Sequence, residues 1–199
     1  MVLQAKEFGF QIISDETYGP KDDDMTVQLT KIRDSEAQAI VCWGTNPGPA
    51  KVARNVKQLG IKLPLFMSHG VSSKKFIELA GEGAEGIILP SGKVIVADQL
   101  PKSDPQKKAL MNYVNKYKEN YKVEGDHFGG HAGDAVMLLK RAFEQGAFSS
   151  AEIRDQLEKT KKFAGIGGTF SYSPQDHAGL TSEAFVLVQV VKGDWKLIK

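Results

Sequence analysis

The first ninety residues alternate between short apolar runs and segments with helical periodicity. The apolar runs are typical of strands and lie at residues 10–14, 39–43, 63–68 and 86–90. Between them, apolar residues recur at spacings of three and four, as on one face of a helix. These helical segments are Met25–Ile32, Val52–Leu59 and Ser73–Ala80. The pattern therefore predicts the order βαβαβαβ.

Residues at the ends of these segments support the same boundaries. Asp22, Asp23 and Asp24 precede the first helical segment, where carboxylates accept hydrogen bonds from free amide groups. Pro47 or Pro49 suits the first turn of the second helix, and Gly60 suits its end.

Apolar strands separated by helices indicate a parallel sheet that is covered on both faces. The predicted fold class is thus α/β, with a doubly wound parallel sheet. In such sheets, ligands bind beyond the carboxyl ends of the strands, where loops converge.

The pattern changes after residue 92, where three helices follow one another. Ser103 with Gln106 and Ser149 with Glu152 predict capping boxes at the first and third of these helices. The second helix, after "HFGG", is expected to pack through its most apolar face, formed by Ala132, Val136, Leu139 and Phe143. Residues 184–198 predict two strands that turn at Lys192, Gly193 and Asp194.

The loop Gly44–Pro49 follows a strand that is expected to be central. Its small and turn-forming residues would leave space for a ligand and direct Thr45 and Asn46 toward it. A tight loop without a ligand explains the same residues, so the pattern alone leaves both interpretations open.

Composition and charge exclude several classes of function. The 199 residues carry a formal net charge of +2 without a long run of one sign, so no nucleic-acid or anionic-membrane surface is visible. No apolar stretch reaches the roughly 20 residues that span a bilayer, and the start does not resemble a signal peptide. The protein is then either cytoplasmic or a chain whose targeting segment has been removed. Cys42, the single cysteine, lies in an apolar run typical of a buried thiol.

Catalytic or cofactor chemistry finds little support in the sequence. His127 and His131 with Asp126 have a spacing that can serve a metal, but a third ligand is missing, and a cluster fixed by hydrogen bonds is the simpler interpretation. "GIGG" at 165–168 lacks the phosphate-binding pattern and is typical of a flexible turn. We therefore expect no enzyme activity, no cofactor and no metal. Burial statistics favour core positions for Trp43 and Phe128.

The order of the motifs resembles a known family. The segments that carry the resemblance are "QLTKIRDSEAQAIVCWGTNPGPAKVARNVKQLGIKLPLF", "LAGEGAEGIILP", "DPQKKALMNYVNKYKENY", "HAGDAVMLLKRAFEQGA" and "GIGGTFSYSPQDHAG". They are similar to the type I periplasmic solute-binding proteins of branched-chain amino acid ABC transporters, and they cover nearly the whole chain.

The resemblance implies a two-lobed clamp that closes on a small solute and delivers it to an ABC permease in the membrane. It places this sequence in the carboxy-terminal portion of such a protein. Residues 1–92 and 165–199 would form the second lobe, and 93–164 would be helices that belong to the first lobe. Apolar faces without partners would then favour a homo-oligomer or marginal stability.

The resemblance also implies residues that bind the solute, and it places them at Thr45, His69 and Phe128. Asn46 joins this predicted set through its position in the loop after the strand. The family has an acidic residue for the ammonium group of an amino acid where this sequence has His69. An imidazole cannot supply a fixed negative charge, so we expect a solute with a carboxylate and without a required ammonium, such as an aromatic or aliphatic acid, with a branched-chain amino acid as the conventional choice.

The expected function is thus an extracytoplasmic solute-binding component of an ABC importer. The full-length protein would be periplasmic or extracellular and directed there by a signal or a lipid. A ligand-sensing domain of a receptor or regulator would have the same fold and remains an alternative. A hydrolase-like or metal enzyme that uses His69, His127 and His131 is the third interpretation.

Overall fold

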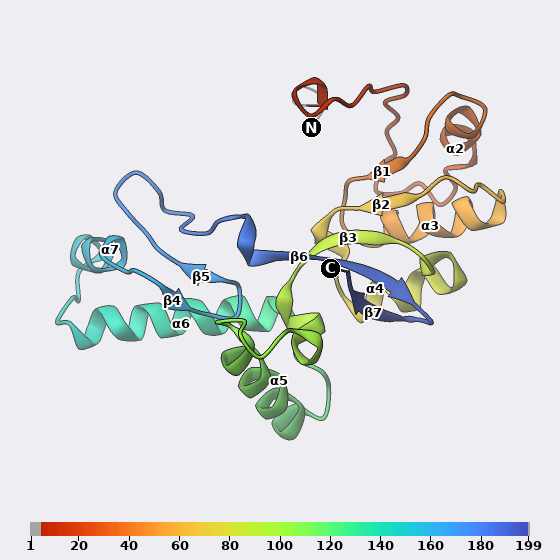
Figure 1. The fold of residues 1–199 in the computed structure, drawn as a ribbon. Helices are drawn as coiled ribbons and strands as arrows, with labels where there is room; N and C mark the ends of the chain where they lie inside the picture. The colour runs from red at the N-terminus through yellow and green to blue at the C-terminus, as the bar shows by residue number, and fades with distance from the viewer. Residues whose placement is uncertain (1–4, 199) are drawn as a thin grey trace. The chain divides into compact units, whose positions relative to one another are not determined.

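The structure is a computed structural model that describes residues 5–198 (Figure 1). Its α-helices are α2 (Thr26–Arg33), α3 (Gly48–Gln58), α4 (Lys74–Ala80), α5 (Lys107–Tyr121), α6 (His127–Glu144) and α7 (Ser150–Glu158). Its strands are β1 (Ile40–Cys42), β2 (Leu65–Met67), β3 (Ile88–Gly92), β4 (Phe163–Ala164), β5 (Thr169–Phe170), β6 (Phe185–Val191) and β7 (Asp194–Leu197). The chain forms two compact units, Met1–Leu89 with Gln189–Trp195 and Pro90–Val188 with Lys196–Lys199.

The main sheet contains five strands in the order β1-β2-β3-β6-β7. β1 pairs in parallel with β2, with Ile40, Val41 and Cys42 opposite Leu65, Phe66 and Met67. β2 pairs in parallel with β3. The βαβ units predicted from residues 39–90 are confirmed, and the fold class is α/β. β4 and β5 form a separate antiparallel pair.

The local signals at the helix ends of the first unit form as predicted. Asp24 accepts a hydrogen bond from the backbone N–H of Thr26 at 2.8 Å, next to the start of α2. α3 begins with Pro49 in its first turn, and Gly60 follows it with a φ of 64°. A left-handed φ of this kind is open to glycine without a steric cost, which explains the residue type.

The strand predicted at residues 10–14 is absent from the structure, and that prediction is wrong. This segment has no regular secondary structure, and Phe10, Ile12 and Ile13 are exposed. A strand needs a neighbouring strand to satisfy its backbone groups, and among the described residues none pairs with this segment. Val41 of β1 is also half exposed, so the sheet is not covered on both faces at this edge.

The first unit has an aromatic contact at its centre and a fixed turn at its end. Phe76 of α4 is fully buried and stacks against Trp195 of β7, with ring centroids 6.4 Å apart.

The predicted turn after β6 is confirmed, because Lys192 and Gly193 both have positive φ, of 56° and 75°. The Glu85 carboxylate accepts hydrogen bonds from both of their backbone N–H groups, at 2.9 and 3.3 Å.

The second unit packs around Leu110 of α5, which is fully buried. Val94, Ala97 and Leu100 complete the buried cluster around it. The capping box predicted for Ser103 and Gln106 does not form. The Asp104 carboxylate accepts from the Gln106 N–H at 2.8 Å instead, while the capping box of Ser149 and Glu152 is present at α7 as predicted.

Helix α6 packs through a different face from the one predicted. Its buried residues are Gly130, Asp134, Leu138 and Ala142. Val136, Leu139 and Phe143 are exposed by 64%, 39% and 44%, so the prediction that they face inward is wrong. Periodicity identifies the apolar face correctly, but it does not show whether another element covers that face.

The glycine-rich segment 165–168 is a fixed loop and not the flexible turn that was predicted. The buried Asp134 carboxylate accepts hydrogen bonds from the N–H groups of Ile166 and Gly167, at 2.8 and 2.7 Å. The Gln106 side chain donates to the carbonyl of Gly165 at 3.0 Å. A Cβ on Gly165 would lie 2.7 Å from Asp134, so glycine lets the loop approach the carboxylate.

No helix within residues 5–198 combines the length and hydrophobicity needed to cross a bilayer. The assignment of residues 1–92, 93–164 and 165–199 to two lobes of a larger protein stays a prediction.

Replacing Phe76 by Ala is expected to lower the free energy of unfolding by about 3–5 kcal/mol, because it leaves a cavity beside Trp195. Phe10→Ala is the matched control, since Phe10 is 70% exposed, and it should change the value by less than about 0.5 kcal/mol. Urea denaturation followed by circular dichroism measures both. Equal effects of the two variants would contradict the described core.

Asp134→Ala is expected to cost at least about 2 kcal/mol, because two backbone N–H groups lose a charged acceptor. Amide hydrogen exchange at Ile166 and Gly167 should accelerate in this variant. The control is Asp155→Ala, which removes an exposed ion pair with Arg154 and should cost less than about 1 kcal/mol. Unchanged exchange at both amides would show that Asp134 does not hold the loop.

Candidate functional site

The candidate site lies where β1 and β2 end. Because the two strands are parallel, the loop after β1 and the 3₁₀ turn η2 (His69–Val71) after β2 lie at the same edge of the sheet. The buried Ser68 joins them. Its N–H donates to the Cys42 carbonyl at 3.0 Å, and its hydroxyl donates to the Gly44 carbonyl at 2.8 Å and accepts from the Gly44 N–H at 3.3 Å.

The structure brings two of the predicted residues, Thr45 and His69, to neighbouring positions. A Cβ built on Gly70 would lie 3.1 Å from the Thr45 Cγ2 atom, so the turn with His69 approaches the loop closely. Thr45 and His69 are both exposed. The rings of Trp43 and His69 meet edge to face, with centroids 6.3 Å apart and an interplanar angle of 76°.

Asn46, the third predicted residue, follows Thr45 and is half-buried. Its Oδ1 atom is buried and has no hydrogen-bond partner among the residues that the structure describes. A buried polar atom without a partner is costly, and a bound donor would remove that cost. This oxygen is therefore an unused hydrogen-bond acceptor at this edge of the sheet.

The glycines of the loop serve a purpose that the sequence did not reveal. A Cβ on Gly44 would lie 2.6 Å from the Tyr18 hydroxyl, and a Cβ on Gly48 would lie 2.5 Å from the Tyr18 ring. The space beside these glycines is therefore filled by Tyr18, and the expectation that they leave it open for a ligand is wrong at this position.

Tyr18 also reaches the single cysteine below the loop. Its hydroxyl lies 3.6 Å from the Cys42 sulfur. Burial raises the pKa of the Tyr18 phenol, and the hydrogen bond with Cys42 adds to this rise. Burial also raises the pKa of the Cys42 thiol. Both groups are thus neutral near pH 7, and the pair supports the loop without placing a charge there.

Phe128, the fourth predicted residue, belongs to the second unit. It lies in the first turn of α6 and is 63% exposed, with its ring centroid 4.2 Å from that of His127. Asp126 caps this helix by accepting from the Gly129 N–H at 3.0 Å. Within residues 5–198, no three His, Cys, Asp or Glu side chains gather as they would around a metal ion.

Trp43 is the site residue that the burial argument misjudged. It is 63% exposed, and so is Phe128, so the prediction that both belong to the core is wrong. The alternation of inward and outward side chains along the strand indicates that Trp43 is exposed. Ile40 and Cys42 are buried while Val41 is exposed, and this period of two places Trp43 on the exposed face.

Comparison with known proteins shows the family. The family model described as "Periplasmic binding protein" matches residues 1–194. The chain belongs to the periplasmic binding protein family. No curated protein sequence matches it. The resemblance stated from the motifs is confirmed.

Solved structures of ligand-binding receptors and substrate-binding proteins share the fold. An extracellular ligand-binding receptor from Rhodopseudomonas palustris HaA2 is 26% identical, with a TM-score of 0.89 over 99% of this chain and 57% of that protein. The LivJ substrate-binding protein of a Streptococcus pneumoniae branched-chain amino acid transporter, solved with isoleucine, is 25% identical, with a TM-score of 0.75 over 98% and 55%. A leucine binding protein, LivK, from Thermotoga maritima is 24% identical, with a TM-score of 0.81 over 100% and 54%.

This periplasmic binding protein chain spans just over half the length of these structures. They are described as receptors and binding proteins and not as enzymes, in agreement with the predicted binding function. That Thr45, Asn46, His69 and Phe128 bind a solute stays a prediction.

Ser68→Ala is expected to lower the free energy of unfolding by about 1–3 kcal/mol, because it removes the bonds to the Gly44 backbone. The Gly44 amide should also exchange faster with solvent. Ser103→Ala is the control, since Ser103 is exposed, and should change stability by less than about 0.5 kcal/mol. A Gly44 amide that exchanges at the wild-type rate would contradict the role of Ser68.

Proposed function

We propose that this chain forms one wall of the solute site of an extracytoplasmic binding protein, and that the protein delivers its solute to an ABC permease. The carrying observation is the parallel pairing of β1 and β2, which places Thr45, Asn46 and His69 at one edge of the sheet. Membership in the family and the likeness to the isoleucine-bound LivJ support the proposal. Phe128 enters it through the resemblance alone.

The proposed solute is a small carboxylate. The His69 imidazole can donate a hydrogen bond to a carboxylate, and the exposed Trp43 ring beside it offers an apolar surface for an aromatic or aliphatic group. His69 cannot provide the fixed negative charge that an ammonium requires. An aromatic or aliphatic acid therefore suits these residues better than an amino acid does.

The proposed mechanism is closure of two lobes around the solute, with higher affinity in the closed state. A protein with this role acts outside the cytoplasm, so we propose that a signal or a lipid anchor directs the full-length protein there. The proposal needs no enzyme activity.

A ligand-sensing domain of a receptor is the second candidate. The observation that favours it is the likeness to a protein described as an extracellular ligand-binding receptor. A permease gene beside the gene of this protein would support transport, and a signalling domain on the same polypeptide would support sensing.

Titration of the ¹⁵N-labelled chain with benzoate, leucine and isobutylamine tests the solute class. Benzoate should shift the indole N–H signal of Trp43 at lower concentration than leucine, and isobutylamine should leave it unchanged. Trp195 is 4% exposed and serves as the internal reference.

His69→Ala should weaken benzoate binding about tenfold, the loss expected for one hydrogen bond to a charged group. The control is His177→Ala, which removes an exposed histidine of the second unit that contacts Glu158. Leucine binding that is tighter than benzoate binding and survives His69→Ala would refute the proposed solute class.

A further inference from the structure

Tyr18 reaches the candidate site from a segment that has no helix or strand. This segment, residues 16–24, precedes α2, and we call it the strap. Tyr18 fills the space beside Gly44 and Gly48, the two glycines of the loop after β1. Neither glycine has a positive φ, so the backbone itself does not require glycine at these positions. The contact with Tyr18 is therefore what excludes a larger residue.

The two glycines meet different atoms of Tyr18. A Cβ on Gly44 would lie 2.6 Å from the Tyr18 hydroxyl oxygen, and the next nearest atom, Cγ of Pro49, would lie 3.3 Å away. A Cβ on Gly48 would lie 2.5 Å from the Tyr18 ring atom Cε2 and 3.2 Å from Cζ. Position 44 is thus restricted mainly by the hydroxyl, whereas position 48 is restricted by the ring.

Hydrogen bonds on both sides of Tyr18 fasten the strap to the neighbouring helices. The Gln28 side chain of α2 donates to the Thr17 carbonyl at 3.0 Å, and the Lys51 side chain of α3 donates to the Asp22 carbonyl at 2.9 Å. The Lys51 side chain is only 14% exposed. Because both bonds go to backbone atoms of the strap, they oppose a movement of Tyr18 away from the loop.

We propose that Tyr18 is a positioning residue of the solute site. Thr45 and Asn46 lie between Gly44 and Gly48, so the contact of Tyr18 with both glycines fixes the loop on either side of the two predicted ligand contacts. A loop that is already ordered loses little conformational entropy when a solute binds, so this contact raises the affinity for the solute through the loop. The inference rests on the proposed function, because it gives Tyr18 a role in that same site.

Alanine at each glycine, alone and together with Tyr18→Phe, tests the contact without a solute. In ¹⁵N relaxation, the backbone order parameters of Thr45 and Asn46 should be about 0.85 in the wild type and below about 0.6 in Gly44→Ala. Adding Tyr18→Phe should restore them, because it removes the hydroxyl that the new Cβ meets. Gly48→Ala should lower the same order parameters, and Tyr18→Phe should not restore them, because the ring remains. Rescue of both glycine variants, or of neither, would overturn the inference.

Benzoate titration, followed through the Trp43 indole signal, tests the effect on binding. Tyr18→Ala should weaken benzoate binding at least about tenfold, whereas Tyr18→Phe keeps the ring and should stay within about threefold of the wild type. Tyr121→Ala is the control, because it removes an exposed tyrosine of the second unit, and it should leave the affinity unchanged. Circular dichroism checks that Tyr18→Ala keeps the helix content of the wild type.

Lys51→Met tests the fastening of the strap. It should weaken benzoate binding about fivefold, because Tyr18 is then held less firmly against the loop. Arg54→Met removes the same charge from an exposed position of α3 and should leave the affinity unchanged. Equal weakening by both variants would assign the effect to charge and overturn the role of the strap.

The titration separates this inference from the proposed function. A wild-type chain that binds benzoate, with an affinity that Tyr18→Ala does not change, would overturn the inference and leave the proposed function in place. A wild-type chain that binds neither benzoate nor leucine would refute the proposed function and the inference with it.

Discussion

The parallel pairing of β1 and β2 is the constraint on which the candidate site depends. Parallel strands end at the same edge of the sheet, so two segments more than twenty residues apart in the chain meet there. Ser68 then fixes their separation, because its backbone and side chain bond to both Cys42 and Gly44. A shift of the register by one residue would exchange the faces of the strand and bury Val41 in place of Cys42. The exposure of Trp43 beside His69 is therefore set by the register that the buried residues of the two strands select.

The loop after β1 contains two kinds of residue. Gly44 and Gly48 support its backbone, and Thr45 and Asn46 are the predicted ligand contacts. Gly44 and Gly48 let the backbone approach Tyr18, and the neutral contact between Tyr18 and Cys42 holds it from below. Thr45 lies exposed above this support, and the unpartnered oxygen of Asn46 is oriented by the same backbone. A rigid loop loses little conformational entropy when a ligand binds, so the packing of Tyr18 would favour the proposed binding without touching the solute. The turn-forming residues of the segment serve the fold first, and Thr45 and Asn46 stay predicted ligand contacts.

The sequence predicted those elements whose signals are local. The ends of α3 and α4 and the turn at Lys192 and Gly193 form as predicted, because capping, proline and left-handed positions act within a few residues. The strand at 10–14 failed because a strand depends on a neighbour that its own pattern does not reveal. At α5, Asp104 accepts the backbone hydrogen bond of Gln106 that was expected for Ser103, because two adjacent acceptors compete for the same N–H group. Thr45, Asn46 and His69 could be placed at one edge from strand order alone, whereas the role of Tyr18 required the packing of a distant loop.

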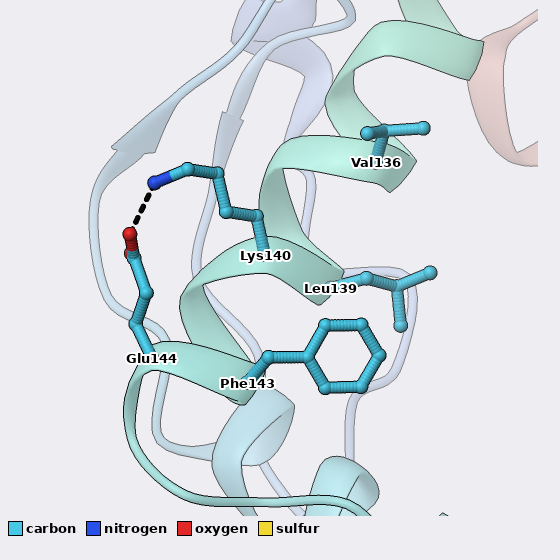
Figure 2. Close-up of a pocket in the computed structure, with 5 residues that line it drawn as sticks. All are labelled: Val136, Leu139, Lys140, Phe143 and Glu144. Atoms are coloured by element: carbon cyan, nitrogen blue, oxygen red, sulfur yellow. Dashed lines mark hydrogen bonds and ion pairs between the residues drawn. The ribbon is translucent and has the colours of Figure 1, made fainter.

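The two faces of α6 differ in chemistry. The buried face makes hydrogen bonds through Asp134, and the opposite face carries large apolar side chains. Its buried face carries an aspartate, a leucine and two small residues, and the loop at 165–168 is bound there through Asp134. This face holds through hydrogen bonds and close backbone approach, since a Cβ on Gly130 would lie 2.3 Å from Ile166. The apolar face, shown in Figure 2, is only partly covered, with Val136, Leu139 and Phe143 exposed by 64%, 39% and 44%. Apolar area that faces water gives no stability to the folded unit until another surface covers it. The same helix is thus held by its own unit through one face, and its opposite face stays partly open to solvent.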